Sequence, residues 1–267
     1  MTKLANQVIW ITGASSGIGE YLAYELVKYP VKLILSARRE SELQRVKDAC
    51  DTSVGAEVAI LPLDLAEADS LEGKCEEATK IYGRVDILIN NGGISQRDMI
   101  INTDMSVSRR LMEVNYFGSV ALSKFLLPQM VKRQTGHHVI ITSAVGIITT
   151  PKRSAYAASK HALHGFYDTL RAEHHDDNIK VTIICPGYVH TNISYNALMG
   201  DGTRQDKLDN AQATGLSPEY TARKIVKAIT AQKQEVYIGG FKEVFGIYLK
   251  RFFPYLFSIA VRKMSVT

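Results

Sequence analysis

The chain has 267 residues, of which 46% are hydrophobic and 22% are charged, so it can bury a sizeable core and is not disordered, collagenous or coiled-coil. The formal net charge is +5. Residues 242–267 hold five basic side chains and one acidic one, or +4. The first 241 residues therefore carry only +1, which argues against a nucleic-acid-binding face.

Three cysteines, Cys50, Cys75 and Cys185, stand far apart and form no CxxC pair. We therefore expect no disulfide scaffold, no metal site and a reducing, cytoplasmic location. The first apolar run, Val8–Thr12, is too short for a signal peptide, so we expect no N-terminal export signal.

Short apolar, β-branched runs alternate with longer amphipathic segments along the chain. Such runs are typical of strands buried on both faces of a parallel sheet. The predicted strands are Val8–Thr12, Val31–Ser36, Glu57–Leu61, Val85–Ile89, His138–Thr142, Val181–Cys185 and Val236–Ile238. The predicted helical segments are Gly19–Tyr29, Glu40–Asp51, Leu65–Tyr82, Ser106–Arg133 and Ala155–Asp177. The alternation predicts an α/β fold with a single-domain, Rossmann-type, doubly wound parallel sheet of about seven strands over residues 1–241, and a C-terminal helical extension over 242–267.

A glycine-rich turn directly follows the first predicted strand. Residues 12–19 read TGASSGIG, a GxxxGxG pattern. Glycines let the backbone approach a pyrophosphate, and the helix that follows presents free N–H groups to it. We therefore predict a dinucleotide site here, the alternative being a tight turn without a ligand. The residues assigned to this part of the site are Gly13, Ser15, Ser16, Gly17, Ile18 and Gly19.

The residues after the second strand decide between the two nicotinamide cofactors. An acidic residue there would accept hydrogen bonds from a ribose hydroxyl and repel a phosphate. The chain instead has Ala37 followed by Arg38 and Arg39, which suit a 2′-phosphate, so we predict NADP(H). Four residues at the carboxyl ends of the third and fourth strands are predicted to contact the adenosine. They are Asp64, Leu65, Asn91 and Gly92.

Tyr156 and Lys160 open a predicted helix and lie four residues apart, so both face one side of it. The ordinary pKa of tyrosine is about 10, which is too high for efficient proton transfer at neutral pH, and a nearby lysine cation would lower it. Ser143 ends the fifth predicted strand and could donate to a carbonyl oxygen. Asn115 lies in a long helical segment, where its carboxamide could hold a water that links Lys160 to solvent. We predict that these four residues are catalytic.

Together these motifs resemble those of the short-chain dehydrogenase/reductase family. The matching stretches are TGASSGIG (12–19), NNGG (90–93, where the family usually has NNAG), Asn115, Ser143, YAASK (156–160) and PGYVHT (186–191). The resemblance implies reversible hydride transfer between a nicotinamide and a carbonyl or alcohol carbon, with Tyr156 as the acid or base and Lys160 bonded to the nicotinamide ribose. It also implies a homodimer or homotetramer. The residues that it places over the nicotinamide are Pro186, Gly187, Val189 and Thr191.

Residues 192–215 depart from the rhythm of strands and helices. They are mostly polar but include Ile193, Tyr195, Leu198 and Met199. This composition predicts a mobile lid with an apolar underside, the alternative being a solvated surface loop. The segment resembles the hydroxysteroid-dehydrogenase-like and dehydrogenase/reductase member 7-like subgroup, which implies a lipophilic carbonyl or alcohol substrate such as a steroid, a retinoid or a bulky ketone. Two other functions stay open: a 3-oxoacyl thioester reductase, and a non-catalytic NADP(H)-binding scaffold.

The C-terminal segment 242–267 is aromatic and basic. Its uncharged run Phe252–Val261 has 10 residues, about half of what a membrane-spanning helix needs. Aromatic residues flanked by cations suit a helix that lies in a membrane interface, so peripheral membrane association is one prediction. Packing against another subunit or over the substrate cleft is the other, and the sequence leaves both open.

Overall fold

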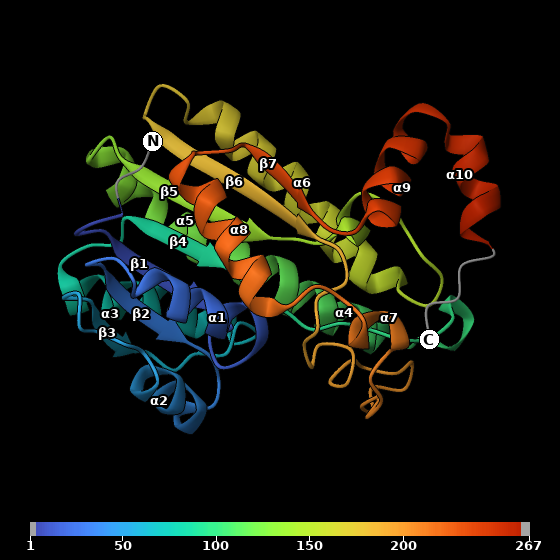
Figure 1. The fold of residues 1–267 in the computed structure, drawn as a ribbon, viewed down its shortest axis with the longest axis horizontal. Coiled ribbons are helices and arrows are strands. Elements are labelled where there is room, and N and C mark those ends of the chain that lie inside the picture. The colour runs from blue at the N-terminus through green and yellow to red at the C-terminus, as the bar shows by residue number, and fades with distance from the viewer. Residues whose placement is uncertain (1–3, 263–267) are drawn as a thin grey trace.

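Seven parallel strands form one sheet in the order β3-β2-β1-β4-β5-β6-β7 (Figure 1). The computed structural model describes residues 4–262. The strands are β1 (Val8–Thr12), β2 (Lys32–Ser36), β3 (Glu57–Ile60), β4 (Ile87–Asn90), β5 (Gly136–Ile141), β6 (Ile179–Pro186) and β7 (Glu235–Ile238). The predicted doubly wound α/β fold is confirmed, and each predicted strand overlaps an observed one.

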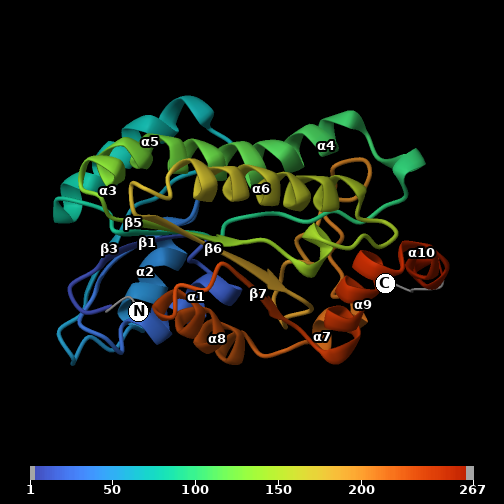
Figure 2. The same cartoon turned by 90° about the horizontal axis from the view of Figure 1, so that it is seen from above.

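Helices cover both faces of this sheet (Figure 2). One face carries α3 (Leu71–Tyr82), α5 (Gly118–Lys132) and α6 (Ser154–Glu173), and the other carries α1 (Gly17–Leu26), α2 (Glu40–Asp48) and α8 (Pro218–Thr230). Successive side chains of a strand point to opposite faces. In β1, Ile9 and Ile11 accordingly pack with residues of α1 and α8, whereas Val8 and Trp10 pack with residues of α5 and α6. A strand with two covered faces must be apolar throughout, which explains the uninterrupted apolar runs.

The strand order reverses between β1 and β4. The chain places β2 and β3 on one side of β1, and β4 to β7 on the other. Connections therefore leave the carboxyl ends of β1 and β4 in opposite directions and open a crevice between them. Ligands of open α/β sheets bind in such a crevice.

The long helical segment predicted over Ser106–Arg133 is interrupted. The chain forms α4 (Met105–Met112), a π-helical turn (Glu113–Phe117) and then α5. The start of α5 lies close to the loop after β3, since a Cβ at Gly118 would lie only 2.4 Å from the Leu65 carbonyl oxygen. The pattern of apolar residues continues through the turn, so periodicity did not reveal it. Turns of this kind often mark functional sites.

The C-terminal extension is helical, as predicted. Helices α9 (Phe241–Phe252) and α10 (Pro254–Val261) form a hairpin beyond the carboxyl end of β7 (Figure 1). One buried apolar residue of each helix, Ile247 in α9 and Phe257 in α10, packs on the turn that follows β5, with Leu249 and Val261 partly buried against this cluster. Within residues 4–262, none of the helices is both long and apolar enough to cross a membrane.

Candidate active site

The glycine turn joins β1 to α1 in a conformation that other residues resist. Gly13 and Gly17 have left-handed φ angles of 65° and 56°. A Cβ on Gly19 would lie 2.3 Å from the Gly13 carbonyl oxygen, so glycine is needed for α1 to begin this close to the turn. The Asn91 amide donates to the carbonyl oxygens of Thr12 and Gly13 at 3.0 and 3.1 Å, which fixes the turn to the end of β4. No side chain caps the N-terminus of α1, so its N–H groups are available to a phosphate.

One cavity of about 1390 Å³ extends from this turn across the carboxyl ends of the strands. Gly19 lies behind the turn, but the other residues that the sequence assigned to the cofactor line this cavity. They are Gly13, Ser15, Ser16, Gly17, Ile18, Arg38, Arg39, Asp64, Leu65, Asn91, Gly92, Tyr156, Lys160, Pro186, Gly187, Val189 and Thr191. The fold therefore collects residues from most of the chain at one edge of the sheet.

The glycine at position 92, where the family usually has alanine, is explained by its neighbour Leu65. A Cβ on Gly92 would lie 2.6 Å from Cδ1 of Leu65. The leucine side chain thus fills the space that an alanine methyl group would take, and both residues line the cavity. In this chain, Leu65 therefore occupies the space that a side chain at position 92 would need.

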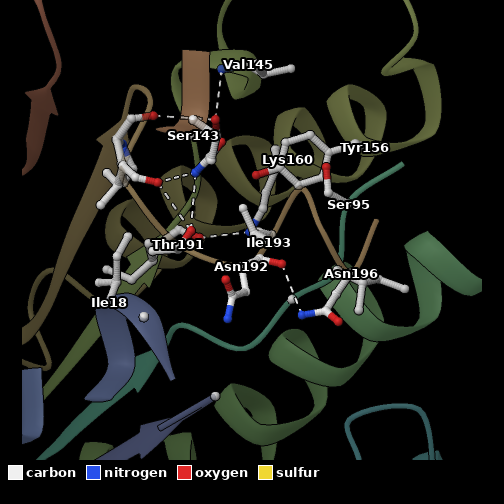
Figure 3. Close-up of a pocket in the computed structure, with 18 of the residues that line it drawn as sticks. Ile18, Ser95, Ser143, Val145, Tyr156, Lys160, Thr191, Asn192, Ile193 and Asn196 are labelled. Atoms are coloured by element: carbon white, nitrogen blue, oxygen red, sulfur yellow. Dashed lines mark hydrogen bonds between the residues drawn. The ribbon is translucent and has the colours of Figure 1, made fainter. Parts of the chain in front are cut away.

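Ser143, Tyr156 and Lys160 meet in the same cavity (Figure 3). Ser143 follows β5, and its hydroxyl accepts from the Val145 N–H at 3.2 Å. Tyr156 and Lys160 lie one turn apart on α6 and are only 6% and 4% exposed. The Lys160 ammonium donates to the Ile141 carbonyl oxygen at 2.9 Å and lies 5.9 Å from the centroid of the Tyr156 ring. Both side chains face the cavity, as their four-residue spacing predicts.

The electrostatic surroundings of Tyr156 differ from those predicted. Burial raises the pKa of Tyr156, and the opposing effects come from contact with the Ser143 side chain and from the positive charges of Arg153 and Arg97. Burial also lowers the pKa of Lys160 to about 8. The sequence assigned the role of the cation to Lys160, and the structure adds Arg153 and Arg97, whose positive charges also favour ionised Tyr156.

Asn115 lies in the π-helical turn and is fully buried. Its carboxamide donates to the Ile94 carbonyl oxygen at 3.0 Å and to the Ser159 hydroxyl at 2.9 Å. The same carboxamide accepts from the Ile94 N–H at 2.8 Å. Each of its polar atoms thus has a protein partner, and the side chain ties the exit of β4 to α6 beside Lys160.

A buried ionic cluster beside Tyr156 was missed in the sequence. Arg97 and Arg153 line the cavity, and both pair with Asp209. The Oδ2 atom of Asp209 lies 2.7 Å from Nη2 of Arg97 and 3.3 Å from Nη2 of Arg153. These residues come from three distant loops, so no local motif marks them. The nearest available signal was the position of Arg153 three residues before Tyr156.

The segment 192–215 borders the cavity, but its buried side is more polar than predicted. Ser194, Asp209 and Gln212 are buried, whereas Tyr195, assigned to the apolar underside, is 43% exposed. Ile193 and Leu198 do line the cavity. The apolar composition was therefore only a partial guide, because Asp209 and Gln212 find partners outside the segment, and Ser194 accepts from the Asp209 N–H within it.

Gln212 attaches this segment to the stretch that the sequence placed over the nicotinamide. It lies in the short helix α7 (Asn210–Ala213). Its amide donates to the Val189 carbonyl oxygen and, at 3.2 Å, to the Thr191 hydroxyl. Thr191 also donates to Val189 within the same turn at 3.3 Å. These bonds make Gln212 a further residue that sequence reasoning missed.

Comparisons with known proteins agree with this architecture. Residues 7–199 match the family described as short chain dehydrogenase. The chain is also 43% identical, over 267 residues, to a Drosophila melanogaster protein named dehydrogenase/reductase SDR family protein 7-like. That alignment covers 99% of this chain and 82% of the fly protein.

Two solved structures share the fold. A short-chain dehydrogenase/reductase from Burkholderia phymatum, in complex with NAD, has a TM-score of 0.83 and 22% identity, and the match covers 94% of this chain and 95% of that one. An alcohol dehydrogenase from the archaeon Thermococcus sibiricus, complexed with 5-hydroxy-NADP, has a TM-score of 0.74 and 23% identity, with 88% and 97% covered. The family match and the identity to the fly protein decide the assignment: this chain belongs to the short-chain dehydrogenase/reductase family of oxidoreductases, whose fold binds NAD(P).

Proposed function

We propose that this chain interconverts a ketone or aldehyde and the corresponding alcohol, with NADP(H) as cofactor and Tyr156 as the residue that transfers the proton. The observation that supports this most is that Ser143, Tyr156 and the glycine turn share one cavity. A carbonyl oxygen must gain a proton when its carbon gains a hydride, so a proton donor beside a dinucleotide site suits this reaction.

The cavity residues fit this cofactor. The glycine turn and the uncapped N-terminus of α1 would hold the pyrophosphate. Lys160 would hold the nicotinamide ribose, and Val189 and Thr191 the carboxamide, as family resemblance implies. When bound, the cofactor supplies or accepts the hydride at its nicotinamide ring.

The side chains around the reacting carbon provide the proton. In reduction, the Tyr156 hydroxyl donates its proton to the substrate oxygen, and the Ser143 hydroxyl donates a hydrogen bond to the same oxygen. In oxidation, the proton moves from the alcohol to Tyr156. Because Tyr156 and Lys160 are buried, little bulk water competes for these contacts.

The test is turnover of a panel of carbonyl compounds, followed by NADPH absorbance. We expect Tyr156→Phe to bind NADPH normally and to lose turnover by about 100-fold or more, since acid–base catalysis contributes about 10²–10⁴-fold. Tyr167→Phe is a matched control, because that hydroxyl is equally buried on α6 but bonds to Asn90 and Ser123. Near-normal turnover in Tyr156→Phe, or an equal loss in the control, would contradict the proposal.

The preference for NADP(H) rests on the end of β2. Arg38 and Arg39 are exposed and line the cavity, and Ala37 stands where an acidic residue would favour NAD(H). We expect a lower KM for NADPH than for NADH in the wild type. Arg38→Gln should raise the KM for NADPH about tenfold or more while changing that for NADH little, because a charge-assisted phosphate contact contributes about 1.5–3 kcal/mol. Arg39→Gln measures how much the second arginine contributes to the KM for NADPH. A wild type that prefers NADH would refute the assignment of NADP(H).

We propose a lipophilic substrate, such as a steroid, a retinoid or a bulky ketone. Apolar side chains from four separate parts of the chain line the cavity together with Tyr156. They are Val107, Val145, Ile148, Ile193, Leu198 and Phe257. A carbonyl panel that spans small polar and large apolar compounds tests this, and a higher kcat/KM for the small polar members would contradict it.

We also propose that the outer face of the α9–α10 hairpin rests on a lipid surface. The exposed apolar residues of this face are Phe241, Phe245, Tyr248, Phe252, Phe253, Tyr255, Leu256 and Ile259. Lys242, Arg251 and Arg262 are exposed beside them and would attract anionic headgroups. Lys250, predicted as a flanking cation, instead donates to the Ile147 carbonyl oxygen.

Flotation with phosphatidylserine-containing vesicles tests this contact on the full chain. The double variant Phe252→Asp/Leu256→Asp should bind vesicles less than the wild type, whereas Val54→Asp, at an exposed site before β3, should bind equally. Sedimentation equilibrium of the same proteins tests the expected homodimer or homotetramer. If the double variant changes the oligomeric state and leaves flotation unaltered, the face is a subunit contact.

A further inference from the structure

A charge imbalance is buried beside Tyr156. The Oδ2 atom of Asp209 accepts from Nε of Arg97 at 2.8 Å and from Nη2 of Arg153 at 3.3 Å. The Arg97, Arg153 and Asp209 side chains are 2%, 5% and 1% exposed. Two guanidinium cations and one carboxylate leave one positive charge in a place that water screens poorly.

Arg153 has fewer hydrogen-bond partners than Arg97. Its Nε has no hydrogen-bond partner among the described residues, and its guanidinium carbon lies 5.2 Å from the centroid of the Tyr188 ring. Arg97, by contrast, also donates to the Ser95 hydroxyl at 2.6 Å. Arg153 immediately precedes α6, and both arginines line the same cavity as Tyr156. Because Arg153 occupies the N-cap position of α6, three residues before Tyr156, the excess charge and the phenol lie at the same end of that helix.

The other neighbours of Tyr156 are mainly apolar. They come from α4, from the exit of β4, from the turn after β5 and from the segment 192–215. They are Val107, Leu111, Ile94, Val145 and Leu198. Arg110 of α4 and Arg204 of the segment also line the cavity, but both are exposed, so solvent and salt screen their charges. On the helix of Tyr156 itself, the Lys160 ammonium is bonded to the Ile141 carbonyl oxygen.

We propose that Arg153 and Arg97 stabilise the ionised form of Tyr156 during turnover and so act as positioning residues for proton transfer. This rests on the proposed function, because it matters only if Tyr156 exchanges a proton with substrate. An ionised Tyr156 supplies the one negative charge that the cluster lacks. The direction agrees with the effect of both arginines on the pKa of Tyr156, which they lower against burial. Guanidinium groups also keep their charge throughout the working pH range.

The experiment titrates Tyr156 directly. In protein labelled with ¹³C at tyrosine Cζ and saturated with NADP⁺, the signal that disappears in Tyr156→Phe reports this hydroxyl without turnover. Arg153→Met should raise its titration midpoint by about one pH unit or more. Arg153→Lys, which keeps a cation, should restore most of the shift. Arg204→Met, which removes an exposed cation of the same cavity, should leave the midpoint unchanged.

The pH dependence of kcat for alcohol oxidation provides a second readout. The limb of this profile on the acidic side should move upward in Arg153→Met by the same amount as the titration midpoint, because oxidation needs the ionised phenol. Arg97→Met should shift both readouts in the same direction, and it serves as the test if Arg153→Met does not fold.

Three results would overturn the proposal. One is an unshifted midpoint in a folded Arg153→Met protein. Another is a shift that Arg153→Lys fails to reverse, because packing would then be the cause. The third is an unshifted midpoint with a raised KM for carboxylate- or phosphate-bearing ketones, which would assign the arginines to a substrate anion. Failure of the proposed function is a separate result, since Tyr156→Phe would then keep near-normal turnover whatever the titration shows.

Discussion

The two ends of the cavity are held together by different forces. The cofactor end, around the glycine turn, depends on close backbone contact: Gly13 and Gly19 leave no room for a Cβ. The substrate end, around Tyr156, depends on buried charge, with Asp209 shared between two arginines. Steric contacts act over tenths of an ångström and do not depend on pH. Buried charges act over several ångströms, and removing one partner destabilises the fold because the other charge is left without a counterion. The two ends should therefore fail in different ways.

The largest expected effect is at the substrate end. Asp209→Asn leaves two buried guanidinium groups without a counterion, which should lower the free energy of unfolding by about 3–5 kcal/mol. Urea denaturation monitored by circular dichroism measures this. Glu57→Gln is the control, because it breaks an ion pair with Lys32 whose side chains are 55% and 41% exposed, and should cost about 1 kcal/mol or less. Equal losses in the two variants would remove the distinction between buried and exposed pairs.

A steric clash at the cofactor end should have a smaller free-energy cost, and it should weaken the binding of NADPH. Gly19→Ala places a methyl group 2.3 Å from a main-chain oxygen and 2.6 Å from the Asn91 amide nitrogen, where neither neighbour can easily shift. Overpacking of about 1–3 kcal/mol should raise the Kd for NADPH by about 5- to 150-fold. Gly73→Ala on α3 meets no atom within 4 Å and should leave Kd unaltered while stabilising the helix slightly. Isothermal titration calorimetry compares them, and unimpaired binding by Gly19→Ala would show that the turn adapts.

The effect that is smallest at neutral pH, and that appears only on acidification, contrasts paired with unpaired buried groups. His138 in β5 is fully buried, and neither ring nitrogen has a hydrogen-bond partner within residues 4–262. Burial lowers the pKa of His138 to about 3 and that of the adjacent His137 to about 4. The unfolded chain, with histidine pKa values of about 6.5, binds these protons more readily. The free energy of unfolding should thus fall as the pH drops from about 6.5 toward 4, by about 1.4 kcal/mol per pH unit for each histidine.

The variant His138→Leu separates the contributions of His137 and His138 to this pH dependence. The variant should lose about half of this slope below pH 6.5. Above pH 7 its stability should depend on pH in the same way as that of the wild type. Denaturant midpoints at several pH values give the slope, which is the readout in place of absolute stability because leucine also alters packing. A slope identical to that of the wild type would mean that His138 takes up no proton on unfolding in this range.

Most of the sheet could be predicted because each strand has its own apolar run. Val8–Thr12 is a clear example, since both faces of β1 are covered. The glycine turn was equally accessible, because its GxxxGxG pattern is confined to residues 13–19, even though Asn91, Gly92 and Thr191, which crowd it, are distant in the sequence. The π-helical turn at Asn115 was not, because one extra residue in a turn leaves the apolar pattern intact.

The charge cluster illustrates what local patterns omit. Asp209 lies 112 residues from Arg97 and 56 from Arg153. Without knowledge of their partners, the polar residues of 192–215, including Asp209, are expected to face solvent. Only the apolar residues then remain for the buried side, so the underside was predicted as apolar. Arg97 and Arg153 were missed as cations near Tyr156 for the same reason: the spacing of Lys160 within one helix is visible in the sequence, whereas contacts between distant loops are not.

The distance along the chain between Arg97 and Asp209 also bears on the order of events at the ribosome. Synthesis proceeds from the N-terminus, so the glycine turn and Asn91 leave the exit tunnel long before Asp209 does. Both guanidinium groups likewise emerge ahead of their counterion, and burying them at that stage would be unfavourable. The wall of the cleft around Tyr156 should therefore stay hydrated while the nascent chain is short, and this end of the cavity should form after the glycine turn.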